Sequence, residues 1–235
     1  MGSVRVFGDA AALADAAAEA VVVALAASLA TLGRASLALS GGRTPVATYR
    51  KLASEQLRSR VDWSHARIFF ADERAVPPGD ATSNFRLARE TLIDPLGIPP
   101  RNVHRMKGEY PDLEAAVEEY EAHLSEPIDA LVLGVGEDGH VASLFPGSPL
   151  VGERARRVAY VLDSPKPPAR RLTLTARALA EARKVLVLAT GTEKAEAVAR
   201  ALEGDVEARE LPARLVRDRD WYLDQAAAAR LSARA

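Results

Sequence analysis

Four short apolar runs constrain the fold of this chain more than any other feature. They lie at Ala35–Ser40, Arg67–Ala71, Ile128–Gly134 and Lys184–Thr190. Each run is bounded by polar residues or glycine and is too short for a helix of ordinary length, so each is predicted to be a buried strand. Stretches with helical periodicity lie between and after them, at Pro45–Leu57, Ser83–Leu92, Leu113–Leu124 and Glu193–Leu202. Strands that are apolar on both faces and alternate with helices are typical of a parallel sheet covered by helices.

The expected fold is therefore α/β, with a mostly parallel, doubly wound, Rossmann-like sheet and helices on both faces. No repeat and no clear linker divides the sequence, so we expect one domain over residues 1–235. Two more runs, Arg156–Val161 and Leu172–Thr175, are candidates for extra strands. Thr44 is expected to be a helix N-cap with Pro45 at the first helical position, and Ser83 is expected to cap the next helix.

Composition narrows the class of protein. The 235 residues include 31 Lys and Arg against 32 Asp and Glu, and this balance argues against nucleic acid as a partner. The absence of cysteine excludes a disulfide scaffold, a thiol nucleophile, a Cys-ligated zinc and an iron–sulfur cluster. Met1–Asp9 has no signal-peptide pattern, and Ala16–Leu32 is Ala-rich and interrupted by Glu19, which favours a buried helix over a membrane span. We expect a soluble, cytoplasmic protein without a membrane partner.

Polar segments follow all four predicted strands. They are Ser40–Thr44, Asp72–Arg74, Gly134–His140 and Thr190–Lys194. In open α/β sheets, ligands bind beyond the carboxyl ends of the strands. Because the four segments carry charged, hydroxyl and glycine residues to one edge, the sequence predicts an active-site crevice there.

The first of these segments has the composition of an anion site. In Ser40-Gly41-Gly42-Arg43-Thr44 the glycine amides, the hydroxyl of Thr44 and a following helix N-terminus would together cradle an anion. The spacing of a nucleotide P-loop is absent. The alternative is an ordinary capped turn between a strand and a helix.

The third segment matches the spacing of a dinucleotide-binding loop, with glycines at Gly134, Gly136 and Gly139. The match is weak, because the segment lies in mid-chain and Pro146 would cut a following helix short. Two other interpretations are a sharp turn that needs glycine for conformational reasons, and an active-site turn that presents Asp138 and His140.

His140 is the candidate general base. Imidazole titrates near neutral pH, and this histidine follows a buried strand by a few residues, two positions after Asp138, which would orient it. A structural histidine is the alternative. No histidine spacing typical of a metal site occurs, so no metal is expected.

Charged residues in the other segments complete the candidate site. Asp72 and Arg74 follow the second strand, and the plainer interpretation of this triplet is a solvated strand end with an internal ion pair. Lys166 and Arg171 flank a stiff Ser164–Pro168 loop. Lys194 lies at a predicted helix start, where a cation is unfavourable unless an anion binds beside it.

At these residues the sequence resembles the 6-phosphogluconolactonase family, within the larger group that includes glucosamine-6-phosphate deaminases. The motifs that carry the resemblance occur in order along nearly the whole chain: SGGRTP at Ser40–Pro45, DER at Asp72–Arg74, SNF at Ser83–Phe85, GEDGHVASLFPG at Gly136–Gly147, SPKPPARRLTLT at Ser164–Thr175 and GTEKAEAV at Gly191–Val198. The chain departs from the family pattern at Arg43, Val141 and Ala169-Arg170.

The resemblance implies hydrolysis of 6-phospho-D-glucono-1,5-lactone in the oxidative pentose phosphate pathway, without a metal or an organic cofactor. His140 would activate water, Asp138 would orient His140, Arg74 and glycine amides would stabilise the oxyanion, and Asp72 corresponds in place to a family active-site carboxylate. Residues expected to bind the substrate are Ser40, Gly41, Gly42, Arg43, Thr44, Gly139, Lys166, Arg171 and Lys194.

Three alternatives stay open. In the deaminase branch a Glu typically stands five residues after the motif histidine and a Tyr ends the strand-end triplet, whereas this chain has Phe145 and Arg74. A catalytically silent sugar-phosphate sensor and a nicotinamide-dependent oxidoreductase are the others. We expect a monomer or a small homo-oligomer.

Overall fold

The computed structural model describes residues 2–232, and its centre is a six-stranded sheet in which every pair of neighbours is parallel. In spatial order the strands are β1 (Val4–Phe7), β9 (Asp220–Asp224), β8 (Lys184–Ala189), β5 (Ala130–Gly134), β2 (Ala35–Leu39) and β3 (Ala66–Phe70). The four predicted strands are thus confirmed. Strands β1 and β9 were not predicted, because neither forms a continuous apolar run.

A second, three-stranded antiparallel sheet lies beside the first. It consists of β4 (Asp72–Arg74), β7 (Arg171–Leu174) and β6 (Val158–Val161). The two extra strands suggested by the sequence are confirmed as β6 and β7. Asp72–Arg74, however, was predicted to be a loop, and it is a strand because it pairs with β7, with Asp72 opposite Thr173 and Arg74 opposite Arg171.

Helices cover both faces of the large sheet, as predicted. Successive side chains of a strand point to opposite faces. The ring of Phe70 in β3 packs edge-on against Phe85 of α4 (Asn84–Ala88), with 6.1 Å between centroids. Its neighbour Phe69 packs against Tyr120 of α6 (Leu113–His123) at 6.2 Å, on the opposite face.

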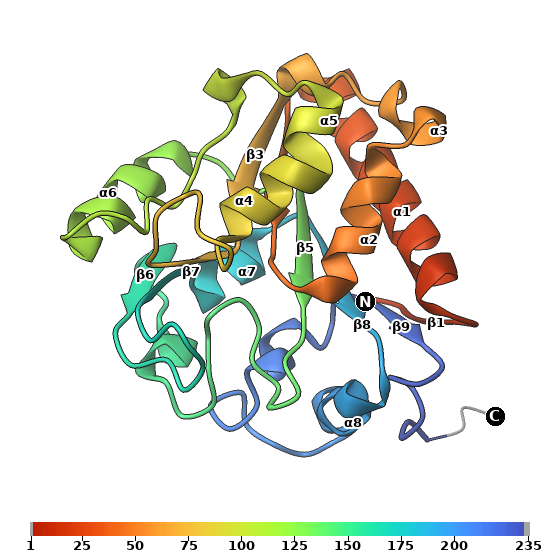
Figure 1. Ribbon diagram of the computed structural model, residues 1–235. Helices are drawn as coiled ribbons and strands as arrows, with labels where there is room; N and C mark the ends of the chain where they lie inside the picture. The colour runs from red at the N-terminus through yellow and green to blue at the C-terminus, as the bar shows by residue number, and fades with distance from the viewer. Residues whose placement is uncertain (1, 233–235) are drawn as a thin grey trace.

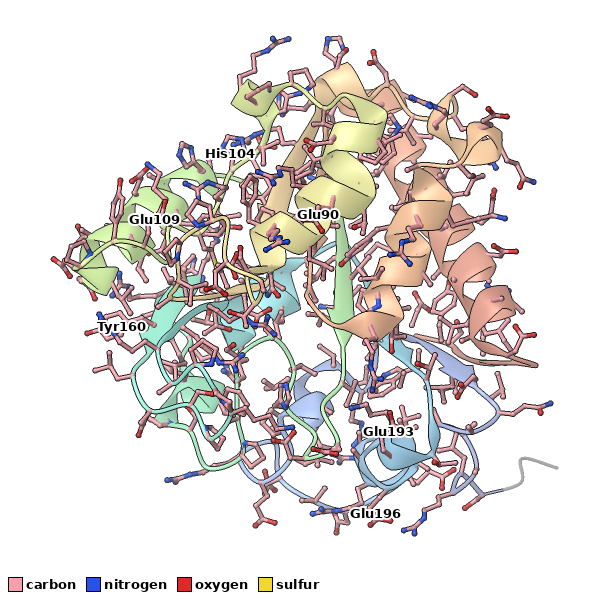
Figure 2. The ribbon with its side chains drawn as sticks, in the orientation of Figure 1. Glu90, His104, Glu109, Tyr160, Glu193 and Glu196 are labelled. Carbon is pink, nitrogen blue, oxygen red and sulfur yellow. The ribbon has the colours of Figure 1, made fainter. Side chains whose placement is uncertain are left out.

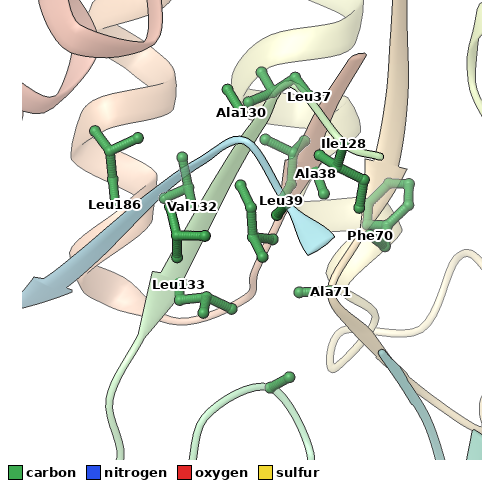
Figure 3. Packing of buried hydrophobic residues seen from close by; sticks show 14 of the residues in the cluster. Leu37, Ala38, Leu39, Phe70, Ala71, Ile128, Ala130, Val132, Leu133 and Leu186 are labelled. Carbon is green, nitrogen blue, oxygen red and sulfur yellow. The ribbon is translucent and has the colours of Figure 1, made fainter. Parts of the chain in front are cut away.

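Helix α1 (Ala10–Leu32) packs against α2 (Arg43–Leu52) and crosses the sheet (Figure 1). Asp9 caps its start, and Gly33, at φ +68°, ends it. The helix is long and apolar enough to cross a membrane, but the face that includes Leu13, Val21 and Leu25 is fully buried in the core. It packs as the predicted core helix. The core beneath the helices is mostly aliphatic, with the ring of Phe70 among the aliphatic side chains (Figure 3).

The other helical segments are short. They are α3 (Glu55–Arg58), α5 (Asp94–Leu96), α7 (Ala176–Glu181) and α8 (Ala195–Leu202), with a π-turn at Arg89–Ile93 and 3₁₀ turns at Trp63–His65, Pro100–Asn102, Pro149–Gly152, Thr192–Lys194 and Pro212–Val216. The helix predicted over Pro45–Leu57 is therefore two helices. Ser83 is confirmed as a cap, since its Oγ accepts from the backbone N–H of Arg86. Thr44 is not a cap, and Pro45 is not the first helical residue: α2 begins at Arg43, two residues earlier than predicted, with Gly42 at the N-cap position.

The order of the strands locates the crevice. From β2 the chain moves outward to β3 and then returns to β5 on the other side of β2. The direction of winding reverses there, so the carboxyl ends of β2 and β5 flank the place where a ligand binds in such sheets. In Figure 1 the arrow of β5 points down into the loops of the lower half.

Candidate active site

A cavity of about 600 Å³ opens at the carboxyl ends of the strands. All four polar segments identified from the sequence contribute to its wall. The predicted site residues that line it are Ser40, Gly41, Gly42, Arg43, Thr44, Asp72, Arg74, His140, Lys166, Arg171 and Lys194. Asp138 and Gly139 do not line it. Within residues 2–232, no three His, Asp or Glu side chains gather as metal ligands.

His140 and Asp138 form a close pair at the cavity. Nδ1 of His140 lies 2.5 Å from Oδ1 of Asp138. Burial opposes ionisation of Asp138, but hydrogen bonds and charge from His140, together with Lys166, outweigh burial and hold the pKa of Asp138 below its ordinary value. A carboxylate only accepts hydrogen bonds, so Nδ1 is the donor, and the neutral ring keeps its lone pair on Nε2. This is the arrangement of a base that takes a proton from a bound molecule.

The glycine-rich turn makes room for this pair. The N–H of Gly136 donates to the carbonyl of His140, and the N–H of Gly139 donates to the carbonyl of Gly136. A Cβ on Gly136 would lie 2.0 Å from Nδ1 of His140, so only glycine fits. Gly139, at φ +79°, faces Leu211 instead of the cavity. No helix begins directly after Gly139, since residues 140–148 form turns and isolated bridges, so the dinucleotide interpretation is wrong.

The start of α2 forms one end of the cavity. Gly42 precedes the helix at φ +100° and no side chain caps it, so the N–H groups of the first turn have no capping partner. Instead of capping the helix, Thr44 shares a 2.8 Å hydrogen bond with the hydroxyl of Thr190, after β8. Free N–H groups at a helix start attract anions.

Two cationic residues, Arg43 and Lys194, lie at the same end of the cavity as the start of α2. Lys194 ends the 3₁₀ turn Thr192–Lys194 just before α8. Figure 2 marks the position of Glu193 in this turn. Lys166 pairs with Glu137 at 3.3 Å, whereas Arg43 and Lys194 form no ion pair within residues 2–232. The positive charges of Arg43 and Lys194 are therefore available to an anionic ligand.

Asp224, which the sequence analysis missed, supports the turn that carries Lys194. Both of its carboxylate oxygens lie 3.1 Å from the backbone nitrogen of Gly191, a residue at φ +94°. Asp224 also lines the cavity. It ends the unpredicted strand β9, so no pattern near it marked it as part of the site.

Asp72 is buried at the cavity wall and is held by two residues that were not predicted from the sequence. Oγ of Ser143 donates to Oδ2 of Asp72 at 2.8 Å, and Nδ2 of Asn84 donates to Oδ1 at 3.1 Å. Asn84 lies within the SNF motif and Ser143 within the long histidine motif, and those motifs are the only signals that could have found them.

Glu73 and Arg74 do not form the ion pair that the plainer interpretation expected. Glu73 is buried and accepts hydrogen bonds from the N–H groups of Arg74, Asn84 and Phe85 and from the hydroxyl of Ser83. Burial raises the pKa of Glu73 even though these bonds oppose the shift. Glu73 thus anchors the start of α4, and the guanidinium of Arg74 donates to the carbonyl of Thr82.

Arg171 braces the loop that carries Lys166. Its Nε donates to the carbonyl of Pro168 at 3.1 Å, and its Nη2 donates to the carbonyls of Lys166 and Pro167, both at 3.0 Å. Its guanidinium also lies 5.5 Å from the ring of Phe145, which packs against His140 at 4.7 Å. Arg171 therefore positions Lys166 as well as lining the cavity.

Comparisons with known proteins agree on one family. Residues 8–224 match the family model described as glucosamine-6-phosphate isomerases/6-phosphogluconolactonase. The chain is 41% identical to the 6-phosphogluconolactonase of Streptomyces coelicolor, over 93% of this chain and 90% of that protein. It is 39% identical to that of Mycobacterium tuberculosis, over 97% and 98%.

Solved structures are similar over almost the full length. The 6-phosphogluconolactonase of Trypanosoma brucei superimposes with a TM-score of 0.84 at 30% identity, over 99% of both chains. That of Thermotoga maritima gives 0.83 at 31% identity, over 95% of this chain and 100% of the other. A monomeric glucosamine-6-phosphate deaminase, at 24% identity and a TM-score of 0.83, shares the fold.

Proposed function

Because the chain belongs to the glucosamine-6-phosphate isomerase/6-phosphogluconolactonase family, we propose that it hydrolyses 6-phospho-D-glucono-1,5-lactone to 6-phospho-D-gluconate. This reaction is the second step of the oxidative pentose phosphate pathway. The observation that carries the proposal is His140, hydrogen-bonded to Asp138, at the wall of a cavity that Arg43, Lys194 and the start of α2 also line.

The first step is attack by water on the lactone carbonyl. A lactone is an activated ester, so it needs a base but no covalent nucleophile. Nε2 of His140 takes a proton from water as the water oxygen bonds to C1. The carbonyl oxygen becomes an oxyanion, and Arg74, which lines the cavity, is a candidate donor from a side chain.

The second step opens the ring. The tetrahedral intermediate collapses, the bond between C1 and the ring oxygen breaks, and the imidazolium of His140 returns its proton to that oxygen. Asp138 stabilises the imidazolium while it exists, because its carboxylate lies 2.5 Å from Nδ1. The product carboxylic acid then loses its proton to solvent, which gives the 6-phospho-D-gluconate anion and the acid release that an assay follows.

The phosphate binds at the other end of the cavity. The N–H groups at the start of α2, the hydroxyl of Thr44 and the charge of Lys194 supply donors for a dianion. Arg43 adds a further positive charge at the rim. With the phosphate anchored there, the lactone ring extends toward His140 and Asp72.

The deaminase alternative is less well supported. Phe145 occupies the place where that branch carries a carboxylate, and its buried ring packs against His140. An apolar ring neither accepts nor delivers a proton, so Phe145 cannot do what a carboxylate at this position could do. We expect the protein to act in the cytoplasm, as a monomer or small homo-oligomer, without a metal or organic cofactor.

A coupled assay tests the proposal. Glucose-6-phosphate dehydrogenase generates the lactone, and acid release is followed with and without this protein. The proposal expects release to be faster than spontaneous hydrolysis. Release at the spontaneous rate would contradict it, and ammonia release from glucosamine 6-phosphate would favour the deaminase instead.

A further inference from the structure

We propose that Ser143 is a positioning residue, which fixes the carboxylate of Asp72 so that Asp72 accepts a hydrogen bond from a hydroxyl of the sugar lactone. The inference rests on the proposed lactonase function and deepens it. Ser143 lies three residues after His140, within the long histidine motif, and no role was predicted for it from the sequence.

Ser143 links the histidine loop to the second sheet. It is fully buried, and its Oγ donates to Oδ2 of Asp72 at 2.8 Å. Its backbone N–H donates to Oγ1 of Thr173 at 3.1 Å, and Thr173 is the partner of Asp72 in the β4–β7 ladder. The hydroxyl and the backbone of one residue therefore both attach the loop to the same rung of the sheet.

Asn84 completes the support of Asp72 from the other side. Its Nδ2 donates to the backbone carbonyl of Asp72 at 2.8 Å and to Oδ1 at 3.1 Å. Each carboxylate oxygen thus has one donor from the protein, and each can accept a second hydrogen bond. Since Asp72 lines the cavity, the remaining acceptor positions are available to a ligand, and sugar hydroxyls are donors of the matching kind.

The segment before Ser143 needs this attachment. Ala142 lines the cavity at φ +50°, a left-handed conformation that residues other than glycine seldom adopt. Strained residues persist where the surrounding structure holds them. The two hydrogen bonds of Ser143 are the adjacent restraint, so loss of its hydroxyl frees Asp72 to rotate away from the substrate.

A double-mutant cycle tests the coupling. S143A, D72A and the double variant are assayed for kcat and KM, with S148A as a control that removes another serine of the same loop. Loss of a hydrogen bond to a charged group predicts about a tenfold or larger fall in kcat/KM for S143A. In the D72A background, S143A should lower kcat/KM by less than about twofold, because the carboxylate that Ser143 binds is gone. Equal losses in both backgrounds would overturn the proposal.

Deoxy lactones test the hydroxyl. A panel of 6-phosphogluconolactones, each lacking one ring hydroxyl, is assayed with the unmodified protein and S143A. The proposal expects one of them to lose the sensitivity to S143A. Uniform sensitivity across the panel would overturn it. If S143A does not fold, S143C, which keeps the volume and a weak donor, takes its place in both experiments.

The two proposals fail in different ways. An unmodified protein without lactonase activity contradicts the proposed function, and this inference falls with it. An active protein with additive Ser143 and Asp72 effects contradicts this inference alone.

Discussion

Oδ1 of Asp138 lies 2.5 Å from Nδ1 of His140 and 3.3 Å from the backbone nitrogen of the same residue. One carboxylate oxygen therefore holds both the ring and the chain that carries it. The pKa of Asp138 stays below its ordinary value, since the hydrogen bonds and charge of His140 outweigh burial. Asp138 is thus ionised throughout the neutral range, and the ring keeps one orientation there.

The first prediction follows from this contact. D138N should lower kcat by about tenfold or more, because an amide in that position no longer fixes the tautomer of His140 or stabilises its charged form. KM and the thermal midpoint should change little. The matched control is E137Q, the adjacent carboxylate, which pairs only with Lys166. A parental kcat in D138N would show that Asp138 merely caps the turn.

Two glycines of the same loop make a steric test. In G136A the new Cβ would lie 2.0 Å from Nδ1 of His140 and 2.4 Å from Oδ1 of Asp138, so the pair must separate. The nearest atom to a Cβ on Gly134 is 3.9 Å away, and G134A is the control. We expect kcat to fall by about 10²-fold or more in G136A, and by far less in G134A. Equal activities of G136A and G134A would mean that the His140–Asp138 pair is not required for catalysis.

The phosphate anchor predicts a selective loss. K194A should weaken binding of the phosphorylated lactone by about 1.5–3 kcal/mol, the range for a charge-assisted hydrogen bond. Unphosphorylated gluconolactone should be a poor substrate of both proteins, with little difference between them. K51A removes a lysine that pairs with Asp15, away from the cavity, and should match the parent. An equal loss on both lactones would show that Lys194 does not bind phosphate.

Stability should depend on pH through His104, which lies outside the cavity and stacks on Phe69. Burial and the charge of Arg67 lower the pKa of His104 to about 4. An unfolded histidine titrates near 6.5, so from pH 6.5 down toward 4 the unfolded chain holds a proton that the folded protein lacks. The free energy of unfolding should therefore fall as pH decreases through that window.

Urea denaturation at pH 7.5 and pH 5 measures this effect against H104Q. Because the ring is only partly buried, we expect the parent to lose about 1 kcal/mol more than H104Q between the two pH values. Glu73, whose raised pKa acts in the opposite direction, is present in both proteins and cancels in the difference. H65Q, at an exposed histidine, is the control. Parallel losses in the parent and H104Q would contradict the assignment.

The central sheet was predictable because its strands are apolar on both faces. Leu37 and Ala38 in β2, like Val132 and Leu133 in β5, point to opposite faces and are all buried, and such apolar runs stand out in a sequence. The edge strand β1 was not predictable, since Arg5 and Val6 are exposed and the strand has only four residues. Strand β4 was missed because its conformation depends on pairing with β7, nearly a hundred residues away.

The candidate site, like the fold, has residues that could be predicted from the sequence and residues that could not. His140, Lys194 and the Ser40–Thr44 segment follow recognisable strands, so the topology alone brings them together. Ser143, Asn84 and Asp224 act through hydrogen bonds to distant partners, and no local pattern encodes such contacts. The N-cap of α2 shows the same limit: Thr44 has the chemistry of a cap, yet it bonds to Thr190.

The most direct test of the account is the kcat of H140A, with the spontaneous rate of lactone hydrolysis subtracted at each pH. A general base contributes about 10²–10⁴-fold, so we expect a loss of that order in a variant that unfolds at nearly the parental temperature and still binds 6-phosphogluconate. H123Q, at an exposed histidine on α6, should keep the parental rate. If H140A retained more than roughly a tenth of the parental kcat, His140 would not be the base.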